Sequence, residues 1–487
     1  MVLPVGSPGG AGGGAPGVGG GFVDATATAV EYCEGAAQQH PEHGEFLATV
    51  ASEVREKLWH QLTVDVLEFC TGAEQAAAAS SGKPGGAADA QVLLDLYDKV
   101  VLKVAPKLNP LSLSRIAASV ASSLAHSDRT AAKALLENLL DDTEARRVQQ
   151  QQSASMAASP IGGGGGYTQE TATRFQLASI YLRSHHSLLL LQPLVQDPSA
   201  DCDKDGALLS GVRSTIRKNA AILTQDLDVG EGGSAGGGDK TEQALVRAAH
   251  YRQAMTYHKV VGPPEAFYEQ AMLYLNYAGD GTLSATSAGT TGTANENLQL
   301  AVDLCLAALT GDGVYHLQRV VQRQSGLLTL LESSPTHAWL AHMFRAVADG
   351  KVDDLRQLAE RHGTEIEQQP ALRHRFTAVQ EKVTLLALVA FVSDKPSHER
   401  CLEFDEIARA ISVTADQVEW VVMRALAVGL LQGSIDQVDA KVDVTWVMPR
   451  VLNQEQLSDL ASKFGSWAVK VGQTKEYMHE QTPMTFA

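Results

Sequence analysis

Apolar residues recur at steps of three and four along most of the first 300 residues, which is the spacing of one buried helix face. One stripe predicts a helix that Pro106 ends, and its members are Val92, Leu93, Leu96, Val100 and Val104. A second predicted helix covers residues 109–124, and a third starts after the Gly262-Pro263-Pro264 break. Residues 26–300 therefore predict an all-α domain of successive helix pairs, an α-solenoid of helical repeats.

The helical pattern continues to residue 392 and then changes. One long helix is expected over residues 376–390, before Lys395-Pro396. Two short helices are predicted, at 404–411 and from Thr414 to Leu431, and two strands at 433–436 and 441–447. In the last strand Val442, Val444 and Trp446 alternate with polar residues. Two helices joined by a turn and followed by a two-stranded wing form a winged-helix module.

The last predicted helix opens at Asn453 and carries its large apolar residues on one seam. The members of the seam are Leu457, Leu460, Phe464, Trp467 and Val471, spaced by three and four. An a/d stripe of this kind packs against another helix. The seam either packs on the winged helix of the same chain or binds a helix of another protein. We favour another protein, because the seam follows a complete module.

Glycine is concentrated in runs that have almost nothing to bury, and we interpret them as a disordered tail and loop insertions. These runs are residues 1–22, 72–90, 149–166, 229–239 and 279–294. Four parts of the chain are therefore expected. They are a tail at 1–25, the helical repeats at 26–300, a second domain at 301–450 (helical part 301–396, winged helix 398–450), and an assembly helix and tail at 451–487.

Charge argues against nucleic acid as a partner. The chain has 39 Lys and Arg against 56 Asp and Glu, a net charge of −17, which repels phosphate backbones. Arg424 is the only basic residue of the predicted second helix of the winged helix, so that helix does not suit the major groove. We expect the module to bind protein, with the edge of its wing strand open to another strand.

Cysteine usage and hydropathy indicate a soluble intracellular protein that binds no membrane. The five cysteines are scattered and include no C-x-x-C pair, which argues against a disulfide framework or a cysteine-based zinc site. The densest apolar stretch, residues 385–392, is shorter than the roughly 18 residues of a membrane helix. The glycine-rich start lacks the pattern of a signal peptide.

Motifs for catalysis and metal binding match only in part. G-x-S-x-G at 232–236 and G-x-G-x-x-G at 12–17 lie in glycine runs, without the strand and helix that these motifs need. His398-Glu399 begins an H-E-x-x-H pattern, but Leu402 replaces the second histidine. The adjacent pair His185-His186 points to different helix faces. We expect no catalytic residue, cofactor or metal, and no enzyme; an active site assembled only by folding is the alternative.

Helical repeats followed by a winged helix and a terminal helix resemble the PCI family. Its members occur in the proteasome lid, the COP9 signalosome and a translation-initiation complex. The closer likeness is to a lid subunit, and it rests on KLWHQLT at 57–63, NPLSL at 109–113, VGL, GSID and VD within 428–439, and TWV and PRVL within 445–452. On this resemblance residues 301–450 are the PCI domain.

The resemblance implies a non-catalytic structural subunit of the lid, which supports lid assembly and ubiquitin-dependent protein degradation in cytoplasm and nucleus. It implies three partners: other PCI subunits, the helical bundle of the lid, and a nearby ubiquitin receptor. The expected interface residues are Val442, Val444, Trp446, Leu457, Leu460, Phe464, Trp467 and Val471. The alternative for the three wing residues is a place in the winged-helix core. The alternative functions are a signalosome or initiation-complex subunit, or an RNA-associated adaptor.

Overall fold

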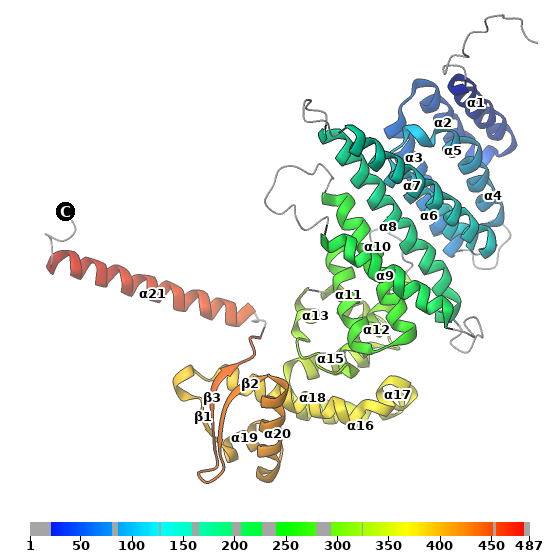
Figure 1. Cartoon of the computed structure of the whole chain (residues 1–487). Coiled ribbons are helices and arrows are strands. Elements are labelled where there is room, and N and C mark those ends of the chain that lie inside the picture. The colour runs from blue at the N-terminus through cyan, green and yellow to red at the C-terminus, as the bar shows by residue number, and fades with distance from the viewer. Residues whose placement is uncertain are drawn as a thin grey trace, which may run out of the picture. The chain divides into compact units, whose positions relative to one another are not determined.

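The computed structural model of the chain consists of helices and one small sheet (Figure 1). It describes residues 21–79, 86–125, 128–157, 165–196, 206–225, 240–278, 294–323, 325–450 and 454–481. The contacts divide the chain into two units, Met1–Glu296 and Asn297–Ala487. Each unit is considered by itself below.

The first unit is made of helices that pack on their neighbours in sequence. The pairs α1 and α2, α6 and α7, α7 and α8, and α10 and α11 lie side by side, and α10 also contacts α8. This is the arrangement of helical repeats, so the predicted α-solenoid is confirmed. The elements are α1 Gly21–Gln39, η1 Pro41–His43, α2 Gly44–Glu56, α3 Trp59–Ala79, α4 Gly86–Leu96, η2 Tyr97–Val101, α5 Leu102–Val104, η3 Ala105–Lys107, α6 Pro110–Ala125, α7 Arg129–Ala157, α8 Gly165–Gln196, α9 Ala207–Gln225, α10 Lys240–Val261 and α11 Pro264–Ala278.

The apolar stripe that Pro106 ends is buried, as its spacing predicts. All five of its members lie in the core of the first unit. The stripe is not one uniform α-helix, because its middle forms the π-helical turn η2 between α4 and α5. Its core also includes Leu113, Ile116 and Val120 of α6.

Two of the glycine-rich runs are more helical than predicted. Helix α3 continues to Ala79, and α7 continues to Ala157 through its Gln- and Ser-rich end. Alanine and glutamine are good helix formers, so a segment with little to bury still extends an existing helix. Most residues of the other glycine-rich runs lie outside the described residues, and both glycine motifs, at 12–17 and 232–236, lie wholly outside them.

The second unit joins a helical part to a winged helix. Its elements are α12 Ala294–Thr310, which starts just before the unit, α13 Gln318–Arg323, α14 Ser325–Ser333, α15 Ala338–Asp349, α16 Val352–Arg361, α17 Gly363–Gln368, α18 Pro370–Asp394, η6 Ser397–Glu399, β1 Cys401–Glu403, α19 Phe404–Ala410, α20 Ala415–Val428, β2 Leu431–Asp436, β3 Lys441–Val447 and α21 Gln454–Gln481.

Helix α18 is the central helix of this unit. It is long and apolar enough to cross a membrane by length and composition alone. Half of its most apolar stretch is buried inside the protein, and Val383 and Val389 lie in the core. Its buried Lys382 donates hydrogen bonds to carbonyl groups at the end of α12. We therefore interpret α18 as a core helix of the fold.

The winged helix differs from its prediction in the bounds of two elements and in one added strand. Strand β2 begins at Leu431 instead of residue 433. Helix α20 ends at Val428 instead of Leu431, because Gly429 has a φ of 78°, the left-handed conformation that stops a helix. Residues 401–403 form a third strand, β1, which the sequence analysis missed. The sheet is antiparallel in the order β1-β3-β2. Val418, Val422 and Ala425 of α20 pack in the core beneath it.

Candidate assembly interface

Strand β3 places the three predicted wing residues in two environments. Val442 and Val444 are 1% and 4% exposed and belong to the winged-helix core, whereas Trp446 is 41% exposed. The side chains of the two valines are therefore core, and their prediction as contact residues is corrected. Of the three, only the Trp446 side chain lies on the surface.

A β-bulge causes this difference. Gln432 pairs with Trp446 and Gly433 pairs with Val444, so Thr445 is an extra residue in β3. One extra residue turns the side chains that follow to the opposite face of the sheet. The hydroxyl of Thr445 donates a hydrogen bond of 3.0 Å to the carbonyl oxygen of Gln432. The bulge therefore exposes Trp446, although it continues the alternation of Val442 and Val444.

Glycine is required at position 433 on the facing strand. A Cβ atom there would lie 2.1 Å from the carbonyl oxygen of Asp443 and 3.0 Å from the Cα of Val444. Only a residue without a side chain permits two strands to approach this closely.

The position of β3 in the sheet corrects a second prediction. Strand β3 is central, so residues 441–447 are not the open edge that the sequence analysis expected. The edges belong to β1, which has three residues, and β2, which has six. Within the described part of the chain, no strand pairs with the outer edge of β2. The backbone groups of β2 are therefore the ones that another strand would meet.

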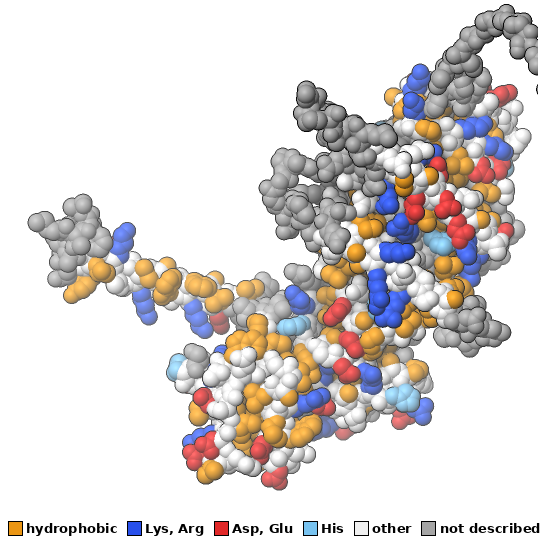
Figure 2. All heavy atoms as spheres, viewed as in Figure 1, with side chains coloured by type: hydrophobic (Ala, Val, Ile, Leu, Met, Phe, Trp, Pro, Cys, Tyr) orange, Lys and Arg blue, Asp and Glu red, His pale blue; other side chains and the backbone are white. Residues whose placement is uncertain are grey.

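Helix α21 presents its apolar seam to solvent. Leu457, Leu460, Phe464, Trp467 and Val471 are between 38% and 64% exposed. Every side chain of residues 457–478 is exposed, so this part of the helix is not buried against the winged helix of its own chain. Figure 2 shows the apolar side chains following one another along α21.

An exposed stripe of this size is a source of binding energy. Fully burying one exposed large apolar side chain contributes about 1.5–3 kcal/mol, and the five seam residues are about half exposed, so covering them contributes on the order of 5 kcal/mol before the costs of association. Contiguous apolar surface on a soluble protein marks an interaction site. Leu, Phe and Trp at a/d spacing suit a partner helix.

The second winged-helix helix, α20, also has an exposed apolar face that the sequence analysis missed. Trp420 is 55% exposed and Met423 is 47% exposed. Both lie within the helix that the sequence predicts, but neither was expected as a surface contact. The signal was present in the sequence: the buried face of α20 uses Val418, Val421 and Ala425, and the two larger residues fall outside that stripe.

Histidines, the usual candidates for catalysis, have structural surroundings here. His185 packs against Tyr181 with ring centroids 4.4 Å apart and a tilt of 40° between the rings, and burial lowers its pKa to about 3. His186 faces Glu137 on the neighbouring helix at 3.2 Å. His398 lies 3.4 Å from the carboxylate of its neighbour Glu399, and this is its one ion pair within the described residues. Within the same residues, no cluster of three or more His, Cys, Asp or Glu could hold a metal.

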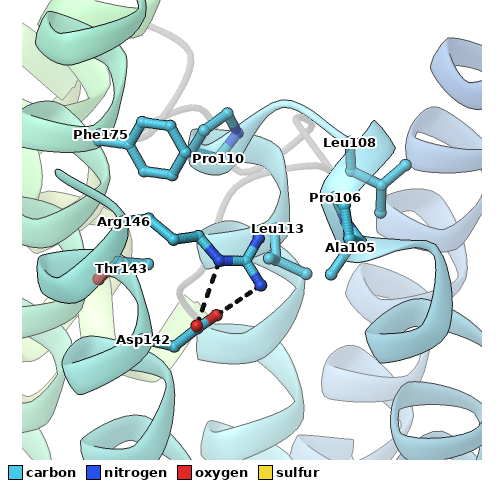
Figure 3. Close-up of a pocket in the computed structure, with 9 residues that line it drawn as sticks. All are labelled: Ala105, Pro106, Leu108, Pro110, Leu113, Asp142, Thr143, Arg146 and Phe175. Atoms are coloured by element: carbon cyan, nitrogen blue, oxygen red, sulfur yellow. Dashed lines mark hydrogen bonds and ion pairs between the residues drawn. The ribbon is translucent and has the colours of Figure 1, made fainter. Parts of the chain in front are cut away.

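A small pocket lies between η3, α6, α7 and α8 (Figure 3). Its volume is about 40 Å³, enough for water but far below the several hundred Å³ of a substrate site. Leu108, Leu113 and Phe175 form apolar walls, and Asp142 and Arg146 are paired with each other at 2.8 Å. The pocket therefore offers neither room nor an unpaired charged group for catalysis.

Comparison with known proteins identifies the families that this chain resembles. A family model described as PSD13 N-terminal repeats matches residues 46–186 and 235–344, and a PCI domain model matches residues 359–446. The 26S proteasome non-ATPase regulatory subunit 13 homolog B of Arabidopsis thaliana is 26% identical over 455 residues, which cover 93% of this chain and 98% of the relative.

Two further relatives match over about half of the chain. Subunit 13 of Dictyostelium discoideum is 28% identical over 49% of this chain and 59% of its own length. The 26S proteasome regulatory subunit RPN9 of Saccharomyces cerevisiae is 29% identical over 47% of this chain and 55% of its own length. Because the PSD13 repeats cover more than half of its residues and a PCI domain follows them, this chain belongs to the PSD13 family of proteasome regulatory subunits.

Proposed function

We propose that this chain is a non-catalytic structural subunit of the proteasome regulatory particle lid, where it supports lid assembly and ubiquitin-dependent protein degradation. The exposed seam of α21 is the observation that carries the proposal. A chain that keeps five large apolar residues on one helix face in water gains stability when a partner helix covers them. The names of its relatives favour the proteasome over the signalosome, the initiation complex or an RNA adaptor.

Three contacts would hold the subunit in place. The α21 seam would join the helical bundle of the lid through Leu457, Leu460, Phe464, Trp467 and Val471. The winged helix would join another PCI subunit through the edge of β2 and the exposed Trp446. The nearby ubiquitin receptor is the third expected neighbour. The subunit would work in the cytoplasm and nucleus, as part of the proteasome.

A scaffold role also agrees with the chemistry of the described residues. His185 and His250 have pKa values lowered by burial, to about 3 and about 4, so neither is protonated near neutral pH. Burial raises the pKa of the Cys305 thiol to about 12, which removes its nucleophilic thiolate. These groups stabilise a core and do not form an acid–base or nucleophile pair.

Native mass spectrometry of the complex purified through a tag on this chain tests the proposal. We expect lid subunits with this chain in one-to-one ratio. Signalosome or initiation-factor subunits would keep the PCI fold and contradict the assignment to the proteasome. Recovery of RNA that is released by moderate salt would support the adaptor instead.

A further inference from the structure

Helix α20 is apolar on two opposite faces, and only one of them is used by the fold. Val418, Val421, Val422 and Ala425 face the core. Trp420, Met423 and Ala427 are exposed and follow one another by three and four residues. They form a ridge that spans about 10 Å along the helix axis. This ridge, residues 420, 423 and 427, is called the α20 ridge below.

Acidic residues flank the N-terminal end of the α20 ridge, and Asp416 lies one turn before Trp420 on the same face of the helix. Asp416 and Glu419 lie on α20 itself, and Gln437 donates a hydrogen bond of 3.2 Å to Glu419, which ties the wing turn to the helix. Arg424 is already paired with Glu381 at 2.9 Å. Figure 2 shows apolar side chains over the winged helix, with acidic side chains beside them.

We propose that the α20 ridge docks a helix of a partner protein that carries an apolar stripe flanked by Lys and Arg residues. A ridge with steps of three and four packs into the groove of another helix. Tryptophan anchors such contacts, and methionine adapts to the shape of its neighbour. Lys and Arg residues beside the partner's apolar stripe would lie opposite Asp416 and Glu419. Acidic residues at those positions would instead repel them and weaken binding.

The same charges decide against other occupants. A nucleic acid or an anionic membrane would meet acidic residues at Asp416 and Glu419. A second copy of this chain, docked through the same ridge, would set these residues against one another. The proposal does not rest on the α21 seam, because it concerns a different helix.

Photo-cross-linking in the complex purified through a tag on this chain tests the proposal. A photoreactive phenylalanine analogue replaces Met423, and in a parallel sample it replaces Phe464 of the α21 seam. We expect position 423 to cross-link to a peptide of another protein with apolar residues at helical spacing and a positive net charge. Absence of a cross-link at 423, or a cross-link to an acidic segment, nucleic acid or a second copy, would overturn the proposal. Position 464 reports separately on the proposed function.

Charge reversal supplies the second readout. Asp416→Lys with Glu419→Lys should lower the cross-link yield at position 423 at least fivefold, which corresponds to about 1 kcal/mol. The matched control, Glu360→Lys with Glu367→Lys, makes the same change at exposed residues of α16 and α17 and should leave the yield unchanged. Equal yields in both variants would overturn the role of these two acidic residues. Thermal unfolding verifies that each variant is folded.

Discussion

The Nζ atom of Lys382 lies 2.7 Å from the carbonyl oxygen of Gly311, and it also donates a hydrogen bond of 2.9 Å to the carbonyl oxygen of Ala308. The last carbonyl groups of a helix have no partner within the helix and carry partial negative charge. Lys382 therefore caps the end of α12 from α18, and Arg375 does the same at Thr310, at 2.9 Å. These bonds fix α12 against the central helix of the second unit.

Replacing Lys382 by methionine should destabilise the second unit by about 2–4 kcal/mol, because two charged hydrogen bonds are lost and two carbonyl groups are left buried. Urea unfolding of the full chain measures the change. The control is Lys463→Met on the exposed helix α21, which should change stability by less than about 0.5 kcal/mol. Equal effects of the two variants would show that the Lys382 bonds contribute nothing.

Val444 and Trp446 lie two residues apart on β3 and should respond differently to truncation. Val444→Ala removes core packing and should cost about 1–3 kcal/mol of folding stability. Trp446→Ala changes a partly exposed residue and should cost less than about 1 kcal/mol, while it weakens binding of the neighbouring PCI subunit. Thermal unfolding and co-purification separate the two effects. A larger loss of stability for Trp446→Ala than for Val444→Ala would contradict the finding that the bulge turns Trp446 away from the core.

Gly433→Ala should disrupt the wing, because the added Cβ would lie 2.1 Å from the carbonyl oxygen of Asp443. We expect a loss of about 2–4 kcal/mol, similar to other overpacked sites with backbone contact. Ser434→Ala, on the next residue of the same strand, is the matched control and should be nearly neutral. Urea unfolding of both variants tests this, and a neutral Gly433→Ala would mean that the strands are further apart.

Glu53 should make stability depend on pH. Burial, together with the nearby carboxyl of Asp65, raises the pKa of Glu53 from 4.5 to about 7. A raised carboxyl pKa favours the folded state below pH 4.5, and this contribution is lost as the pH rises through 7. Glu53→Gln should therefore increase the Tm at pH 8 by about 2–4 °C and change it little at pH 5.

The control for this titration is Glu45→Gln, an exposed carboxyl on the same helix, α2. It should change the Tm equally little at both pH values. A pH-independent effect of Glu53→Gln would show that the carboxyl of Glu53 is ionised in the folded protein throughout this range.

Periodicity predicted the elements whose apolar residues form a repeated pattern. The stripe from Val92 to Val104, the strand Lys441–Val447 and the α21 seam are of this kind. Features that depend on one residue or on pairing between strands were not predictable. Strand β1 has only three residues, and the bulge at Thr445 is defined by its partner strand. The sequence therefore predicted the alternation along β3, but not that Trp446 faces the opposite side of the sheet from Val442 and Val444.

The exposed seam of α21 is the basis of the proposed function, and a double substitution tests it most directly. Leu460→Asp with Trp467→Asp places two charges on the seam. Ser462→Asp with Ser466→Asp places the same charge on the opposite side of the helix. We expect both variants to fold, with circular dichroism and Tm close to those of the parent chain, because all four side chains are exposed. The decisive measurement is the fraction of each tagged variant that native mass spectrometry finds within the assembled lid. The account predicts at least a tenfold loss for the seam variant, corresponding to about 1.4 kcal/mol, and normal incorporation of the serine variant. Normal incorporation of the seam variant would contradict it.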